Sequence, residues 1–205
     1  MPAMPTSAHR PHAPITHVLY LHGFRSSPQS MKARQVGERI ARDHPGVVWC
    51  CPQLPPSPRE AMALVNQQIA DWPHPQMAVL GSSLGGFYAT WVARQTGCRA
   101  VLLNPAVNPA RDLARYIGEQ TSWHDPQERF FFRPEFVDEL RQLHTGSHEP
   151  DPCMAVIAKG DEVLDWREMT ARYPRARLTL LEGGDHALSD FEPHLAPILG
   201  FLQLS

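Results

Sequence analysis

Residues 81–85, Gly-Ser-Ser-Leu-Gly, constrain the fold of this 205-residue chain more than any other stretch. The apolar residues 77–80 favour a β-strand, and residues 86–93 carry apolar side chains at helical spacing. A serine with a glycine two positions away on each side is typical of a sharp strand-to-helix turn, where larger side chains would collide. A dinucleotide-binding turn would instead place glycine where Ser83 stands. Ser83, and not Ser82, is therefore predicted to project from a tight turn as a candidate nucleophile.

Strand-like and helix-like segments alternate along most of the chain. The predicted strands are 15–21, 47–51, 77–81, 100–103, 153–158 and 178–181. The predicted helices are 30–43, 58–71, the segment that follows residue 83, 166–173 and 192–204. Such alternation is typical of an α/β protein with an open, doubly wound, mostly parallel six-stranded sheet and helices on both faces. Functional side chains are then expected at the carboxyl ends of the strands.

Two segments depart from this alternation. Residues 104–151 contain no good strand and offer two helical stretches around the aromatic residues 130–132. We interpret 105–151 as a helical, lid-like insertion over a substrate pocket, although a plain packing layer would give the same pattern. Residues 1–14, with four prolines, are predicted to form a flexible tail. The remaining residues, 15–205, are predicted to form one domain.

Composition narrows the class of protein. The chain is 42% hydrophobic with a formal net charge of −2, and its charges are interspersed, so neither nucleic acid nor a membrane surface is an expected partner. No apolar run is long enough to span a bilayer, and the N-terminus has no signal or lipidation pattern, which predicts a cytoplasmic protein. The four cysteines lack metal-ligand spacing and are expected to be free thiols in a reducing compartment. We expect no metal and no organic cofactor.

Candidate partners for Ser83 follow later strands. A serine hydroxyl is a weak nucleophile at neutral pH, so it needs a histidine base and a carboxylate that orients the histidine. In chains with this turn the order is serine, acid, histidine. His186 follows a strand and a glycine turn, and Asp161 stands at the end of the preceding strand. Asp165 and Asp185 are alternative acids, but Asp165 is more typical of a helix N-cap. Ser83, Asp161 and His186 are the predicted catalytic residues.

The loop after the first predicted strand is expected to contribute to the active site, both as a backbone hydrogen-bond donor and through residues that line the pocket. A tetrahedral intermediate needs backbone N–H donors, and we assign these to Leu84, directly after the candidate nucleophile, and to Phe24. His22 is expected to brace this loop rather than to act as a second base. Arg25 and Ser26 either contact substrate or cap the next helix. The residues expected to line a substrate pocket are His22, Gly23, Arg25, Ser26, Asn104, Phe130 and Phe131.

Six motifs spread over the chain carry a family resemblance. They are 20–24 (YLHGF) with 26–28 (SSP), 52–55 (PQLP), 81–86 (GSSLGG), 103–106 (LNPA), 160–165 (GDEVLD) and 183–186 (GGDH). From residue 15 onward the chain resembles α/β-hydrolases, and specifically the YqiA-like family of small bacterial esterases. The resemblance implies a compact hydrolase core without the first strands of larger relatives, and it carries Ser83, Asp161 and His186 over as the catalytic triad.

These observations together predict a serine hydrolase. The expected substrate is a small-molecule carboxylic ester or thioester, which the resemblance implies, and the expected route passes through an acyl-enzyme. The same three residues also serve hydrolysis of carbon–carbon, amide or lactone bonds in proteins of this fold. A binding module that holds a small ligand without turning it over is the alternative from another class.

Overall fold

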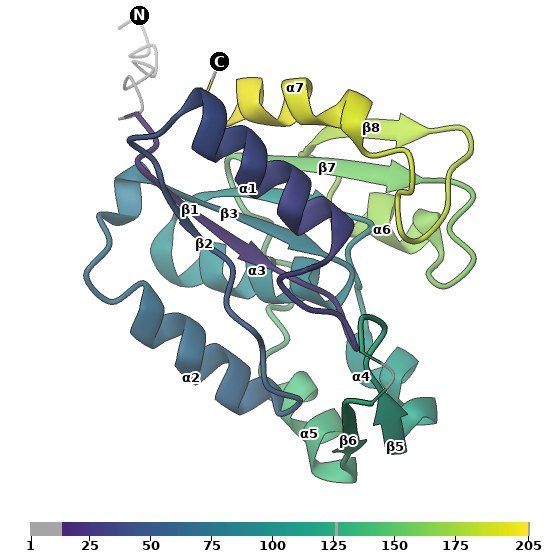
Figure 1. Ribbon diagram of the computed structural model, residues 1–205. Helices are drawn as coiled ribbons and strands as arrows, with labels where there is room; N and C mark the ends of the chain where they lie inside the picture. The colour runs from purple at the N-terminus through teal and green to yellow at the C-terminus, as the bar shows by residue number, and fades with distance from the viewer. Residues whose placement is uncertain (1–13, 126, 205) are drawn as a thin grey trace, which may run out of the picture.

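The computed structural model describes residues 14–125 and 127–204, and a six-stranded parallel sheet lies at its centre (Figure 1). The strands are β1 (His17–Leu21), β2 (Val48–Cys50), β3 (Met77–Ser82), β4 (Arg99–Leu103), β7 (Cys153–Ala158) and β8 (Arg177–Leu181). They lie in the order β2-β1-β3-β4-β7-β8. The predicted open, doubly wound sheet is therefore confirmed. The predicted tail, residues 1–14, lies outside the described residues except for its last one.

Helices cover both faces of this sheet (Figure 1). The helices that pack against it are α1 (Met31–Asp43) and α7 (Glu192–Phe201) on one face, and α2 (Pro58–Gln68), α3 (Leu84–Thr96) and α6 (Trp166–Arg172) on the other. Alternate residues of β3 enter the two layers: Leu80 packs with α1 and α7, whereas Val79 packs with α2 and α3. Burial on both faces is why the central strands read as continuous apolar runs. None of the helices in the described ranges has the length and apolar character that crossing a membrane requires.

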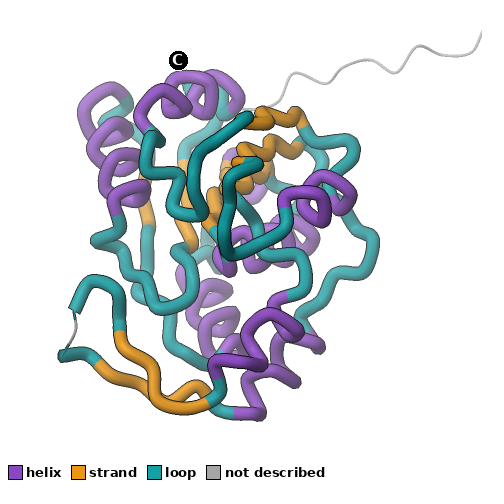
Figure 2. Tube along the Cα trace, turned by 90° about the vertical axis from the view of Figure 1, so that its right-hand side faces the viewer, coloured by secondary structure: helices purple, strands orange, loops and turns teal. Residues whose placement is uncertain are grey.

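The segment between β4 and β7 differs from the prediction. Helices α4 (Pro109–Leu113), η2 (Ala114–Tyr116) and α5 (Pro134–Gln142) are present. Between η2 and α5, however, strands β5 (Gly118–Thr121) and β6 (Arg129–Phe132) form an antiparallel hairpin. The expectation that this segment contains no strand is therefore wrong. Figure 2 shows the hairpin standing apart from the six-stranded sheet, at the end of the molecule away from the C-terminus.

Packing of alternate phenylalanines explains why residues 129–132 form a strand. The Phe24 ring meets the ring of Phe130 at a centroid distance of 5.9 Å and that of Phe132 at 5.1 Å. Phe131 lies on the opposite face of the hairpin and is 57% exposed. This period of two belongs to a strand and not to a helix. The hairpin lies beyond the carboxyl ends of the central strands (Figure 1), and its action as a lid stays a prediction.

The four cysteines are free thiols in the structure. Cys98 and Cys153 are buried, while Cys50 and Cys51 are half-buried. Burial raises the pKa of every one of these thiols, to about 12 for Cys51 and Cys153. Because the thiolate is the reactive form of cysteine, these side chains are poor nucleophiles at neutral pH.

Candidate active site

Ser83 occupies the turn between β3 and α3 in an unusual backbone conformation. Its φ is 56° and its ψ is −120°, which few residues other than glycine adopt. The flanking glycines make the turn feasible: a Cβ on Gly81 would lie 2.1 Å from the carbonyl oxygen of Gly85, and a Cβ on Gly85 would lie 1.9 Å from that of Leu21. The predicted strand, tight turn and helix are all present. The Ser83 side chain consequently stands at the carboxyl edge of the sheet.

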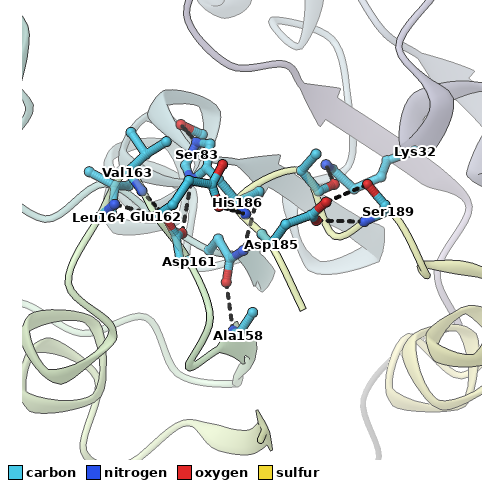
Figure 3. Close-up of polar contacts among 12 residues, drawn as sticks. Lys32, Ser83, Ala158, Asp161, Glu162, Val163, Leu164, Asp185, His186 and Ser189 are labelled. Carbon is cyan, nitrogen blue, oxygen red and sulfur yellow. Dashed lines mark hydrogen bonds and ion pairs between the residues drawn. The ribbon is translucent and has the colours of Figure 1, made fainter. Parts of the chain in front are cut away.

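Ser83, His186 and Asp161 lie in one series of polar contacts (Figure 3). Nε2 of His186 is 2.9 Å from Oγ of Ser83, and Nδ1 is 2.7 Å from Oδ2 of Asp161. The Asp161 side chain is fully buried, and its Oδ1 accepts hydrogen bonds of 2.8 Å from the backbone N–H groups of Val163 and Leu164. A carboxylate held in this way favours the tautomer of His186 with the proton on Nδ1. Nε2 is then free to accept the Ser83 proton.

The two alternative acids have other partners. Oδ1 of Asp165 accepts a hydrogen bond of 2.9 Å from the backbone N–H of Arg167, so this residue caps α6 as expected. The Asp185 carboxylate accepts from the backbone N–H and the hydroxyl of Ser189, at 2.8 and 2.6 Å. Of the three candidates, the structure brings only Asp161 to the His186 ring.

Asn104 was expected to line the pocket, but it holds the His186 loop instead. Its side chain is fully buried, and Nδ2 donates to the carbonyl oxygens of Asp185 and His186, at 3.0 and 3.1 Å. Oδ1 accepts from the backbone N–H of Ala158 at 2.8 Å. One side chain thereby connects the ends of β4 and β7 to the loop that carries His186. The sequence prediction failed because an asparagine after a strand looks the same whether it faces solvent or a neighbouring loop.

We expect Asn104→Ala to lower both stability and activity. The substitution removes the acceptor of the buried Ala158 N–H and the Asn104 donor to the His186 carbonyl oxygen, whereas the Asp185 carbonyl oxygen still accepts from the Leu188 N–H. It should therefore lower the free energy of unfolding by roughly 2 kcal/mol or more. It should also lower kcat by about tenfold or more, because His186 loses its support. Urea unfolding and ester hydrolysis check both effects. Asn108→Ala, which removes an exposed cap of α4, should cost about 1 kcal/mol and leave kcat unchanged. Equal effects of the two substitutions would contradict the assigned role.

Two charged residues that sequence analysis did not single out also hold the His186 loop. Oε2 of Glu162 accepts a hydrogen bond of 3.0 Å from the backbone N–H of His186. The Lys32 ammonium, from α1, donates to the carbonyl oxygen of Ala187, next to His186 (Figure 3). Lys32 is buried on the same side of α1 as Val36. A lysine at an apolar position of the helical period was the available signal.

The buried Lys32 side chain should give stability a specific pH dependence. Burial lowers its pKa from 10.5 to about 8, although the nearby carboxylates of Asp185 and Asp161 act in the opposite direction. Between pH 8 and 10.5 the unfolded chain therefore binds a proton at this residue that the folded protein does not, so stability rises with pH in this window. Relative to Lys32→Met, the wild type should gain roughly 2 to 3 kcal/mol from pH 7 to pH 10. Urea unfolding of both proteins across this range tests it, and parallel curves would contradict it.

The loop after β1 places its backbone against Ser83. A Cβ on Gly23 would lie 3.2 Å from Cβ of Ser83 and 3.6 Å from its Oγ, which shows how close the approach is. Nε2 of His22 accepts from the backbone N–H of Leu54 at 3.0 Å, so the ring proton is on Nδ1, which donates to the carbonyl oxygen of Gly23 at 3.0 Å. Burial lowers the pKa of His22 and favours its neutral form. His22 thus braces the loop, as expected.

Two backbone N–H groups beside Ser83 have no acceptor among the residues that the structure describes. Leu84 is the first residue of α3, where an N–H has no partner within the helix. Phe24 follows Gly23, and its N–H is likewise without a protein acceptor in the described ranges. Both residues line the cavity described next. These are the two donors that sequence analysis assigned to an oxyanion.

A cavity of about 500 Å³ opens over Ser83 and His186. Of the expected lining residues, His22, Gly23, Arg25 and Ser26 contribute to its wall. Most of the remaining wall is apolar, and much of it comes from α4, η2 and the loops after β4, β5 and β7. The apolar residues from these elements are Ala106, Pro109, Leu113, Tyr116, Trp123, Val163 and Leu164. These residues were not among the predicted lining residues, because the lid-like insertion was expected to cover the pocket with Phe130 and Phe131.

The two expected lining phenylalanines lie elsewhere. Phe130 lines a second cavity of about 350 Å³. This cavity shares residues 22–26 and Leu84 with the first, but Ser83 does not line it. Phe131 lines neither cavity, because it lies on the outer face of β6. The expectation for Phe131 is therefore wrong, and that for Phe130 holds only for the second cavity.

The parallel sheet, its two helical layers and the strained turn at Ser83 define an α/β-hydrolase fold. Within this class, the model of the uncharacterised protein family UPF0227 matches residues 17–203, so the chain belongs to that family. A UPF0227 protein of Yersinia enterocolitica is 24% identical over 189 residues, which cover 91% of this chain and 99% of the relative. The resemblance to α/β-hydrolases of the YqiA-like family is thus confirmed.

Solved structures share the fold at low sequence identity. Alpha/beta hydrolase domain-containing protein 10 from mouse is 16% identical with a TM-score of 0.67, and the match covers 92% of this chain and 90% of that protein. Est1E from Butyrivibrio proteoclasticus gives the same identity and TM-score, with 94% and 87% covered. The Pyrococcus furiosus esterase Pf2001 is 18% identical with a TM-score of 0.61, with 94% and 82% covered. At these sequence identities the structural similarity establishes the fold of this chain.

Proposed function

We propose that this protein is a serine hydrolase that cleaves carboxylic esters or thioesters of small molecules through an acyl-enzyme. The observation that carries the proposal is the continuous series from the buried Asp161 carboxylate through His186 to Ser83 Oγ, at the floor of a cavity. The cavity volume of about 500 Å³ lies within the range of small-molecule sites. Its mostly apolar wall suits an acyl chain.

The geometry supports a two-step reaction. Oγ of Ser83 attacks the substrate carbonyl carbon while its proton passes to Nε2 of His186, and Asp161 stabilises the resulting imidazolium. The carbonyl oxygen becomes an oxyanion that accepts hydrogen bonds from the N–H groups of Phe24 and Leu84. The intermediate then collapses: the bond to the leaving oxygen or sulfur breaks, and that atom takes the proton from His186. Water repeats the sequence on the acyl-enzyme, releases the acid and restores Ser83.

The comparison with solved structures supports an ester as the electrophile. The Pyrococcus furiosus protein is named an esterase, and a second structure of Est1E holds ferulic acid. Both share the fold of this chain over more than nine-tenths of its length. An ester is therefore the bond to test first.

Hydrolysis of matched substrates tests the proposal. The purified protein should release p-nitrophenol from p-nitrophenyl acetate, butyrate and octanoate, and it should cleave the p-nitroanilide of butyrate far more slowly. The corresponding thioester of butyrate separates ester from thioester preference. Turnover of the anilide alone would favour an amidase. Saturable binding of these compounds without release of any product would favour a ligand-binding module.

A further inference from the structure

Arg25 adopts a backbone conformation that its side chain disfavours. The backbone N–H of Ser26 donates to the carbonyl oxygen of Gly23 at 3.2 Å, which closes a four-residue turn with Arg25 as its third residue. The φ of Arg25 is +61°, in the left-handed region, where a turn of this kind favours glycine. An arginine at this position therefore needs compensating contacts.

Those contacts come from the β5–β6 hairpin, almost 100 residues further along the chain. Nε of Arg25 donates to the carbonyl oxygen of Thr121 at 2.6 Å, and the carbonyl oxygen of Arg25 accepts from the backbone N–H of Trp123 at 2.8 Å. The guanidinium also lies over the Trp123 ring, 4.1 Å from its centroid. A planar guanidinium can bond and stack at the same time, which a smaller side chain cannot do. We call this set of contacts the Arg25 clamp.

The turn that the Arg25 clamp holds contains the Phe24 N–H. This N–H belongs to the peptide unit between Gly23 and Phe24, and because that unit is planar, the N–H points opposite to the Gly23 carbonyl. The Gly23 carbonyl accepts from the Ser26 N–H and from Nδ1 of His22. The direction of the Phe24 N–H therefore depends on the same turn whose third residue is fixed from the hairpin.

We infer that Arg25 is a positioning residue for the oxyanion donor Phe24, and that the β5–β6 hairpin aligns this donor through the Arg25 clamp. The inference rests on the proposed function, because it concerns an oxyanion only if Ser83 attacks a carbonyl. Donors of this type act on the transition state more than on the bound substrate. Loss of the Arg25 clamp should consequently appear in kcat rather than in KM.

Three substitutions at Arg25 separate the clamp from backbone strain. With p-nitrophenyl acetate, Arg25→Ala should lower kcat by about 10- to 100-fold and change KM by less than about threefold. The inhibition constant of a trifluoromethyl ketone, which forms a tetrahedral adduct with the serine, should rise by the same factor as kcat/KM falls. Arg25→Gly should lose as much as Arg25→Ala, although it removes the strain at φ +61°. Arg25→Lys should recover part of kcat, because its ammonium can still donate to Thr121 and lie over Trp123.

The matched control is Arg39→Ala. Arg39 lies on α1 and pairs with Asp43, so its loss should leave kcat, KM and the inhibition constant unchanged. Thermal melting establishes that each variant is folded. If Arg25→Ala does not fold, the glycine variant, which has no strained φ, takes its place.

Three results would overturn the inference. They are wild-type kcat in both Arg25→Ala and Arg25→Gly, an increase in KM alone, or full activity in Arg25→Gly with loss only in Arg25→Ala. The last would show that backbone strain, and not the clamp, sets the turn. Failure of the proposed function looks different, because the wild type would then hydrolyse no ester or Ser83→Ala would hydrolyse it equally well.

Discussion

Ser83→Ala should lower kcat for p-nitrophenyl butyrate about a millionfold, to the level left by the remaining parts of the site. The alanine has no Oγ, so His186 has no hydroxyl to deprotonate and no acyl-enzyme forms. The fold should survive, because serine and alanine strain the backbone equally at the φ of 56° that this position adopts. The melting temperature should therefore change by no more than a few degrees, whereas kcat should collapse.

A control substitution at an exposed serine and a threshold for residual activity define how the Ser83→Ala result is interpreted. Ser147 is exposed and lies outside the wall of the cavity, so Ser147→Ala should keep the wild-type rate and melting temperature. Both variants are assayed from the same preparation procedure, with the burst of p-nitrophenol measured as well as the steady rate. More than about one per cent of wild-type activity in Ser83→Ala would rule out Ser83 as the nucleophile, given the millionfold loss expected.

Asp161→Asn should lower kcat by about ten-thousandfold while Asp165→Asn leaves it almost unchanged. Oδ1 of Asp161 accepts from two backbone N–H groups, those of Val163 and Leu164. In the asparagine variant the amide oxygen should keep these bonds, so the NH₂ group must face Nδ1 of His186. Nδ1 then has to accept, the ring proton moves to Nε2, and Nε2 can no longer take the proton of Ser83.

The Asp165→Asn variant is the matched control for this argument. Asp165 caps α6, and asparagine caps a helix as well as aspartate does. Activity assays and thermal melts of the two variants check the contrast. Similar losses in both variants, or a loss confined to Asp165→Asn, would contradict the assignment of Asp161 as the acid.

The parts of the site that were predictable from sequence depend on short-range patterns and on the order of strands. The turn at Ser83 needs glycines two residues away on either side, and these glycines can be recognised directly in the sequence. Asp161 and His186 each follow an apolar strand, and the carboxyl ends of parallel strands meet at one edge of a sheet. The positions of these three residues along the chain were therefore enough to predict that they lie together.

The contacts that sequence analysis missed join segments far apart in the chain. Three consecutive phenylalanines do not reveal that they alternate across a hairpin, so the exposure of Phe131 was not predictable. Nor does the sequence indicate that the Asn104 amide reaches the His186 loop, or that Arg25 meets Trp123 across 98 positions. Such pairs are set by tertiary packing, which can override local propensity.

Labelling with a fluorophosphonate, followed by intact mass and peptide mapping, tests the central claim most directly. The reagent reacts with an activated serine and leaves a stable adduct, so it needs no knowledge of the natural substrate. The wild type should gain the mass of one adduct per chain, mapped to Ser83, and folded Ser83→Ala should gain none. A folded wild type that remains unlabelled, or an adduct that maps to another residue and persists in Ser83→Ala, would contradict the account of Ser83, His186 and Asp161 as a working triad.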